Sequence, residues 1–262
     1  MTLELLAQKT PQRAPPCAPP SAQSAPYCQQ CAVRSVALFS ALLPEDLAHL
    51  HATVDDLQFA NGEVLFDQGD QGTALYTIKL GLVKLDRIAE DDSLRVARVA
   101  QRGDLLGLES CLPTPFFYRA TAIGPVRVCR LPTRRIEDLA AEFPGLHRAL
   151  LTRWFQALRE TDEWAALQST GTPLTRLARL LLKLANPQLH DTFYLPSRGD
   201  LGMLIGTRLE TASRLVAAFL RDGLLEKVGP RLYRVNREAL DALVWSGSEG
   251  CRQLRGKVLR VG

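Results

Sequence analysis

The sequence predicts an α+β fold with an N-terminal β-roll, a long helix and a C-terminal winged helix-turn-helix. Three observations predict it: glycines separate short apolar segments between residues 57 and 131, apolar residues recur at helical spacing after Pro144, and a helix–turn–helix pattern begins at Arg198. We divide the chain into an arm, the β-roll, the long helix, the helix-turn-helix domain and a tail, at 1–31, 32–143, 144–170, 171–245 and 246–262.

The composition is that of a soluble globular chain of 262 residues, enough for one large or two ordinary domains. No window approaches the ~20 apolar residues of a membrane helix. The N-terminus lacks a secretory pattern, so we expect a cytoplasmic protein without a membrane partner. Residues 1–150 hold 15 Lys and Arg against 17 Asp and Glu, whereas residues 171–238 hold 11 against 6. A basic C-terminal part favours binding to phosphates.

The predicted strands begin only at about residue 57. Residues 1–27 are rich in Pro, Ala, Gln and Ser, which predicts an irregular arm, and a short helix is expected at Pro44–Leu50. Short strands with glycine breaks then follow, which is typical of a β-roll or barrel. The expected strands include Glu63–Phe66, Ala74–Lys79, Leu82–Arg87, Arg95–Ala100 and Val126–Leu131.

After Pro144 the apolar period becomes helical. Residues recur at alternating four- and three-residue steps, the spacing of a two-stranded coiled-coil seam: His147, Leu151, Trp154, Leu158, Thr161, Ala165 and Gln168. This pattern favours a dimerisation helix with Leu151, Trp154, Leu158, Thr161 and Ala165 at the interface. A helix packed on its own β-domain is the alternative, and both can hold. Gly171-Thr172-Pro173 ends the helix, and Pro173 suits the start of the next one, Leu174–Ala185.

The stretch Arg198–Leu215 predicts two short helices joined by a tight turn at Gly206, where a positive φ costs glycine little. Leu201, Leu204 and Ile205 give the first helix a buried face, and Gly202 allows close approach. On the second helix we expect Leu209, Ala212, Leu215, Val216 and Phe219 to point inward, and Arg208, Glu210, Ser213 and Arg214 to point outward.

Such an outward face suits a helix in the DNA major groove, and an ordinary helical hairpin is the alternative. Leu225–Val228 and Leu232–Val235, around Gly229-Pro230, predict a two-stranded wing.

The order of roll, long helix and winged helix-turn-helix resembles the Crp/Fnr family of bacterial transcription regulators, over nearly the whole chain beyond residue 28. Gly206-x-x-x-Glu210-Thr211-x-Ser213-Arg214 resembles the recognition helix of the FNR branch. Gly103-Asp104-Leu105-Leu106-Gly107 resembles the family's turn within a cyclic-nucleotide-binding-like roll. The resemblance implies a homodimer that binds TTGAT-N4-ATCAA inverted repeats in double-stranded DNA and acts on RNA polymerase at promoters.

The resemblance also implies roles for single residues. Glu210, Ser213 and Arg214 would read bases, and their chemistry agrees, because Arg can bond guanine O6 and N7 together and Glu can accept from cytosine N4. Arg208 and Arg198 are expected to contact phosphates, which position the protein without reading sequence.

The effector has to be inferred from residues of the arm and the roll. Cyclic-AMP sensors of the family place a Glu directly after the second glycine of the turn and an Arg-Ser pair further on. Here Leu108 follows Gly107 and Ala120 follows Arg119, which disfavours a cyclic nucleotide.

The cysteines instead favour the FNR-type [4Fe–4S] cluster, held by thiolates. Cys28 and Cys31 form a CxxC pair, and Cys129 matches the branch's distant fourth ligand. The branch's third N-terminal cysteine is missing, so Cys17 is the expected substitute, with Cys111 in reserve. Assembly of the cluster would tether the arm to the roll and favour the dimer.

Several alternatives remain open at this point. A lone CxxC also suits a half zinc site, a redox pair or chance, and Cys129 could be a buried structural thiol. The effector could be haem, nitric oxide, thiol redox chemistry, a nucleotide or none.

We expect no enzymatic activity. A cupin-like barrel metalloenzyme would need inward-facing histidines, whereas none of the four histidines (His49, His51, His147 and His190) falls in a predicted strand. No Ser/His/Asp set or Walker loop is present. A pure interaction scaffold would leave the outward residues of the second helix unexplained.

Overall fold

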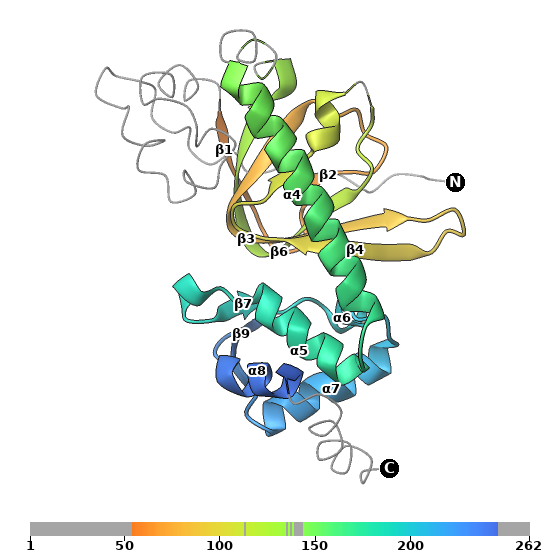
Figure 1. Ribbon diagram of the computed structural model, residues 1–262, viewed down its shortest axis with the longest axis vertical. Helices are drawn as coiled ribbons and strands as arrows, with labels where there is room; N and C mark the ends of the chain where they lie inside the picture. The colour runs from red at the N-terminus through yellow and green to blue at the C-terminus, as the bar shows by residue number, and fades with distance from the viewer. Residues whose placement is uncertain (1–53, 113, 135, 137, 139–143, 246–262) are drawn as a thin grey trace, which may run out of the picture. The chain divides into compact units, whose positions relative to one another are not determined.

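The computed structural model describes residues 54–112, 114–134, 136, 138 and 144–245 (Figure 1). The predicted arm, the short helix at 44–50, the tail and the thiols of Cys17, Cys28 and Cys31 lie outside the described residues. The described residues form two units, one from 54–80 and 102–151 and the other from 81–101 and 152–245. Among the helices that the structure describes, none combines the length and apolar character needed to cross a bilayer.

A six-stranded sheet forms the predicted roll, with β1, β6, β3 and β4 adjacent in that order, β2 paired with β6 and β5 with β3. The strand pairs β1–β6, β2–β6, β3–β4 and β3–β5 are antiparallel. Alternate residues of β6 such as Ala120, Val126 and Val128 are buried, as expected for a strand with one face on a core. The strands are β1 (Asp55–Phe59), β2 (Val64–Phe66), β3 (Ala74–Ile88), β4 (Leu94–Ala100), β5 (Leu105–Leu106) and β6 (Arg119–Pro132).

Two predictions about these strands were wrong in their bounds. The segments expected at 74–79 and 82–87 are one strand, β3, which continues through Gly81 at φ 89°. The segment expected at 126–131 is the second half of β6, which continues through Gly124 at φ 73°. A glycine with positive φ can bend a strand without ending its ladder, so these glycines do not mark turns.

Asp56 of β1 lies directly opposite Cys129 of β6. Residues that pair directly across antiparallel strands point to the same face, so these two side chains share the face opposite to Leu57 and Val128. Asp56 is nonetheless buried, because Lys79 Nζ lies 2.9 Å from its Oδ2 and Arg127 donates to both oxygens at 3.0 and 2.6 Å. Burial raises the pKa of this carboxyl, but the hydrogen bonds from Arg127 and Lys79 outweigh it, and its pKa is lowered.

The predicted long helix is confirmed as α4 (Pro144–Ser169). Trp164 and Leu167 are buried, so the end of this helix packs within its own chain. The five predicted interface residues, by contrast, are all exposed, with Leu151 at 68% and Leu158 at 60%. Phe155 is exposed beside them. The helix therefore has an apolar face that its own described chain leaves open.

The C-terminal unit contains four further helices and a small sheet (Figure 1). Pro173 begins the first of them, and the Thr172 hydroxyl accepts a hydrogen bond from Thr175 N at 3.2 Å, as is typical of a helix cap. The predicted wing is confirmed, but a third strand pairs with it in the order β7-β9-β8. The elements are α5 (Pro173–Leu184), β7 (Thr192–Tyr194), α6 (Arg198–Leu204), α7 (Leu209–Arg221), β8 (Leu225–Lys227), β9 (Leu232–Val235) and α8 (Arg237–Trp245).

Candidate nucleic-acid interface

The first helix of the candidate interface, α6, begins at a side-chain cap. Ser197 Oγ accepts from Asp200 N at 3.1 Å and donates to Asp200 Oδ2 at 2.7 Å. This exchange satisfies an N–H group that the helix start leaves without a backbone partner. Leu201 and Leu204 are fully buried, and so is Ile205 just after the helix. The predicted buried face of α6 is confirmed.

The turn between α6 and α7 depends on two glycines. Gly206 has a φ of 60°, and Thr207 N donates to Gly202 O at 2.8 Å. A Cβ at Gly202 would lie 3.0 Å from Thr207 O, so a larger residue there would push the turn away. Arg176 of α5 donates to Gln168 O at 2.8 Å and to Gly206 O at 3.4 Å. These contacts confirm the predicted turn and hold it against the end of α4.

The second helix, α7, has one buried face and one exposed face. Ala212, Leu215, Val216 and Phe219 are buried as predicted, and Ala218 joins them. Arg208, Glu210 and Arg214 are exposed, and Ser213 is half-buried. Glu210, Ser213 and Arg214 are three and four residues apart and therefore lie on one side of the helix. Glu210 also lies in the first turn, where a negative charge is favourable next to the helix dipole.

Leu209 was predicted to point inward, and this prediction was wrong. It is the first residue of α7 and is 51% exposed. Its Cδ1 lies 3.9 Å from where a Cβ of Gly199 would stand, so at Gly199 α6 has no side chain to cover it. Leu209 consequently joins Arg208 and Glu210 on the exposed side of the helix start.

The candidate phosphate-binding residues differ in their surroundings. Arg208 is exposed and precedes α7 in an extended conformation. Arg198 is only half-exposed, and its Nη1 is buried with no hydrogen-bond partner among the described residues. In the wing, Lys227 and Arg231 are exposed, with Arg231 in the turn at φ 61°. Neither cation was among the predicted DNA-binding residues, although Arg231 directly follows Gly229-Pro230.

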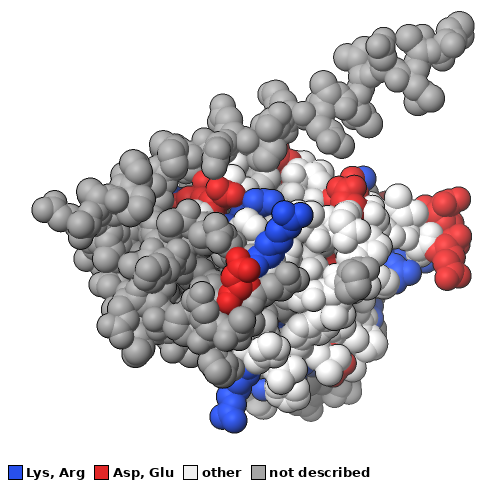
Figure 2. Space-filling view, turned by 90° about the horizontal axis from the view of Figure 1, so that it is seen from above, with Lys and Arg blue, Asp and Glu red and all other residues white. Residues whose placement is uncertain are grey.

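Charge elsewhere on the chain is mixed. Figure 2 shows one face on which acidic and basic side chains are both present and neither sign covers the described surface. This agrees with the nearly equal numbers of acidic and basic residues in the first 150 positions. The exposed cations around α7 and the wing are therefore the better candidates for a phosphate-binding surface.

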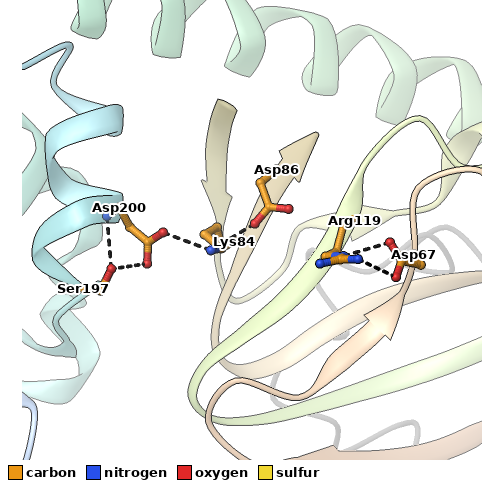
Figure 3. A network of polar contacts seen from close by, with 6 residues as sticks. All are labelled: Asp67, Lys84, Asp86, Arg119, Ser197 and Asp200. Atoms are coloured by element: carbon orange, nitrogen blue, oxygen red, sulfur yellow. Dashed lines mark hydrogen bonds and ion pairs between the residues drawn. The ribbon is translucent and has the colours of Figure 1, made fainter. Parts of the chain in front are cut away.

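The turn of the β-roll is formed as expected, with Gly103 and Gly107 at φ 94° and 77°. Arg119 stands at the arginine position of a cyclic-AMP sensor's Arg-Ser pair, but Ala120 follows it in place of the serine. Its Nε and Nη2 donate to the two oxygens of Asp67, both at 2.8 Å (Figure 3). Those hydrogen bonds from Arg119 lower the pKa of Asp67. An aromatic cluster next to Gly107 contains Phe66 stacked on Phe116 at a centroid distance of 4.0 Å.

Two of the candidate cysteines can be described. Cys129 lies on β6, and Cys111 is the last residue of a short 3-10 helix (Leu108–Cys111); both are half-buried thiols outside any disulfide. Cys129 faces away from Val128, so it is not a core thiol. Among the described residues no group of three or more His, Cys, Asp or Glu could hold a metal.

Comparison with known proteins gives two domain matches in the expected order. A cyclic nucleotide-binding domain matches residues 56–143, and a Crp-like helix-turn-helix domain matches residues 175–243. The solved structure of FixK2 from Bradyrhizobium japonicum is similar with a TM-score of 0.62 at 24% identity, over 72% of this chain and 96% of that chain.

Two curated relatives are similar over most of their length. The fumarate and nitrate reduction regulatory protein of Salmonella typhi is 26% identical over 224 residues, which are 83% of this chain and 90% of that protein. The transcriptional activator protein anr of Pseudomonas aeruginosa is 26% identical over 231 residues, 86% of this chain and 95% of that protein. With the roll and the helix-turn-helix formed as described, these matches show that the chain belongs to the Crp/Fnr family of transcription regulators and is not an enzyme.

Proposed function

We propose that the protein is a homodimeric regulator of the FNR type that binds TTGAT-N4-ATCAA-like inverted repeats and responds to oxygen through a [4Fe–4S] cluster. The observation that carries the DNA part is the exposed side of α7 with Glu210, Ser213 and Arg214. The similarity to the fumarate and nitrate reduction regulator supports the sensing part. Such a protein would act in the cytoplasm, upstream of promoters and together with RNA polymerase.

Base reading would follow from the chemistry of the exposed side chains. Arg214 would bond guanine O6 and N7 in the TTGAT half-site, and Glu210 would accept from the N4 amino group of cytosine. Ser213 lies between them and can donate or accept. Leu209 adds an apolar group that suits the methyl group of thymine.

Affinity would come from phosphate contacts around this helix. Arg208, Arg198 and the wing cations Lys227 and Arg231 are the candidates. The open apolar face of α4 supports the dimer, because one dimer can place two α7 helices on two half-sites about one helical turn apart.

The cluster would be held by Cys17, Cys28, Cys31 and Cys129. The described member of this set fits the role, because Cys129 is a half-exposed thiol on the outer face of β6. A bound cluster would supply a group that reacts with oxygen. The four cysteines would connect the N-terminal arm to β6. Gain or loss of this connection would shift the equilibrium between monomer and dimer.

A cyclic nucleotide is a weaker candidate for the effector. The guanidinium of Arg119 already binds the carboxylate of Asp67 through two bonds, so a ligand phosphate would have to displace it. Leu108, in place of a Glu, offers no acceptor for a ribose hydroxyl.

The DNA part is tested by band shift with a TTGAT-N4-ATCAA duplex under anaerobic conditions. We expect Arg214→Ala to weaken the free energy of binding to this duplex by about 1–3 kcal/mol and to relax the selectivity for one guanine of the half-site. Arg208→Ala should weaken binding to every sequence and lower the salt dependence. Failure of the unaltered protein to shift this duplex would refute the proposed site.

The sensing part is tested by anaerobic purification with iron and sulfide analysis. We expect a coloured protein with about four irons per chain. Cys129→Ser should lose the iron, whereas Cys111→Ser, a matched half-buried thiol, should keep it. A colourless protein that still binds the duplex would leave the DNA part standing and exclude the cluster.

A further inference from the structure

The hairpin of β3 and β4 belongs to the same unit as the helix-turn-helix. In it, residues 83–88 of β3 pair with residues 94–100 of β4. The hairpin thus joins the C-terminal unit although its strands are part of the sheet of the β-roll.

On the β3 side, Lys84 bonds the hairpin to the start of α6. Its Nζ lies 2.9 Å from Asp200 Oδ1 and 3.0 Å from Asp86 Oδ2 (Figure 3). The side chains of Lys84, Asp86 and Asp200 are only 14%, 3% and 15% exposed. The other oxygen of Asp200 accepts from Ser197 in the cap of α6. Lys84 therefore holds the capped end of the first helix of the DNA-binding motif.

The charge of this group makes Lys84 difficult to replace. One ammonium group is shared between two carboxylates, and Asp86 Oδ1 is buried without a hydrogen-bond partner among the described residues. Without Lys84, two carboxylates would face each other away from water, which is strongly unfavourable.

On the β4 side, the hairpin is bonded to the long helix. Arg98 Nη1 lies 3.0 Å from Glu160 Oε2 of α4, and Arg98 is buried. Gln168 Nε2 donates to the carbonyl groups of Val96 and Ala97, both at 3.4 Å. One hairpin thus connects α4, through β4, with α6, through β3.

We propose that this hairpin sets the angle between the long helix and the helix-turn-helix, and that Lys84 is a positioning residue that thereby fixes the half-site spacing the dimer accepts. The inference rests on the proposed function, in which α4 forms the dimer and α7 reads the bases. Each added base pair moves a half-site by about 3.4 Å and turns it by roughly 35°, so a rigidly held α7 accepts one spacing. A loosely held α7 accepts several.

The test compares affinities for inverted repeats with spacers of three, four, five and six base pairs. For Lys84→Met we expect the preference for the best spacer over the next longer one to fall roughly fivefold or more, since one partner of a buried charge pair is lost. The preference for TTGAT over a half-site with its guanine changed should stay as it was. Lys84→Arg should restore the spacer preference at least in part.

Lys79→Met is the matched control, because Lys79 is on the same strand and forms a Lys–Asp pair of equal length, 2.9 Å, with Asp56 in the roll. It should leave the spacer preference unchanged. Asp200→Asn is the second test, since it removes the charge but keeps a side-chain oxygen for Ser197, and it should act like Lys84→Met. A folded Lys84→Met protein with the original spacer preference would overturn the inference.

Hydrogen exchange separates this inference from the proposed function, because it needs no DNA. In Lys84→Met, but not in Lys79→Met, exchange should rise together in residues 82–88 and in α6. Unchanged exchange there would refute the positioning role. If exchange rises in both segments of Lys84→Met but the unaltered protein does not bind DNA, the proposed function is refuted. The connection between the hairpin and α6 would still hold.

Discussion

At the first position of α7, Leu209 keeps about half of its surface exposed, and the residue of α6 near its Cδ1, Gly199, has no side chain to cover it. Val216, two turns further along the same helix, is fully buried against its own unit. The difference follows from the place of each residue in the helix, since the inner side of α7 is buried from Ala212 to Phe219 but not at its first residue. Leu209 therefore adds little to the stability of the unit, and its exposed side chain is available for contact with DNA.

We predict that Leu209→Ala changes the free energy of unfolding by less than about 0.5 kcal/mol. Leu204→Ala, at a fully buried position, should instead cost about 2–5 kcal/mol. Urea titration measures both. In the band shift, Leu209→Ala should weaken binding at thymine positions of the half-site, because the apolar contact with the methyl group is lost. A large loss of stability in Leu209→Ala would contradict this assignment.

Among the elements, the α6–α7 turn shows how a local conformation controls a site. Gly206 has a φ of 60°, and a Cβ there would lie 3.3 Å from Gln168 O. A residue with a side chain at this position would be strained at this φ, and its Cβ would crowd the carbonyl oxygen of Gln168. The turn fixes where α7 begins and thus where its exposed face lies.

Gly206→Ala should lower the free energy of unfolding by about 1–2 kcal/mol, because an L-residue is strained at this φ. Gly145→Ala is the control, since a Cβ there meets nothing within 4 Å and alanine favours a helix. Thermal unfolding of the two variants distinguishes them. Equal melting temperatures for both would show that the turn tolerates alanine.

The strand pair β1–β6 should make the stability of the roll depend on pH. The pKa of Asp56 is lowered in the folded chain, because hydrogen bonds from Arg127 and Lys79 outweigh its burial. A lowered folded pKa gives stability that is present above the unfolded pKa, about 3.9, and is lost as pH falls through the folded value.

Asp56→Asn should therefore reduce stability at pH 7, and the difference from the unaltered protein should shrink below about pH 4. Chemical unfolding at pH 7 and at successively lower pH measures this difference. A difference that stays constant with pH would show that the Asp56 charge does not matter.

The elements also differ in how far the sequence predicts them. The helices α4 to α7 follow from apolar periods and from Pro173 and Gly206, which act within a few residues. The strands β7 and the first half of β6 were missed, because Thr192–Tyr194 is only three residues long and β6 passes through Gly124. A glycine in a strand and a glycine in a turn look alike until the partner strand is known.

At the scale of the whole molecule, the open apolar face of α4 suggests how two chains would act together. Leu151 and Leu158 are exposed by 68% and 60%, which is costly for leucine unless another surface covers it. Two linked DNA-binding units gain affinity because the second half-site is bound from within the same complex.

We predict that Leu158→Glu makes the protein monomeric in analytical ultracentrifugation. Its affinity for the full inverted repeat should fall about a hundredfold or more. Arg159→Ala, next to it and also exposed, should keep the dimer, because its ion pair with Glu163 at 3.9 Å is weak. A dimeric Leu158→Glu protein would move the interface away from this face.

The sequence by itself determined the order of roll, long helix and helix-turn-helix, and the exposed side of α7 with Glu210, Ser213 and Arg214. It could do so because helical period, caps and tight turns depend on residues close together in the chain. Only the tertiary structure decided that Arg119 binds Asp67 and that Lys84 binds Asp200, partners 52 and 116 residues apart. A surface charge in a sequence has many possible partners, and the fold selects one by bringing distant strands and helices together.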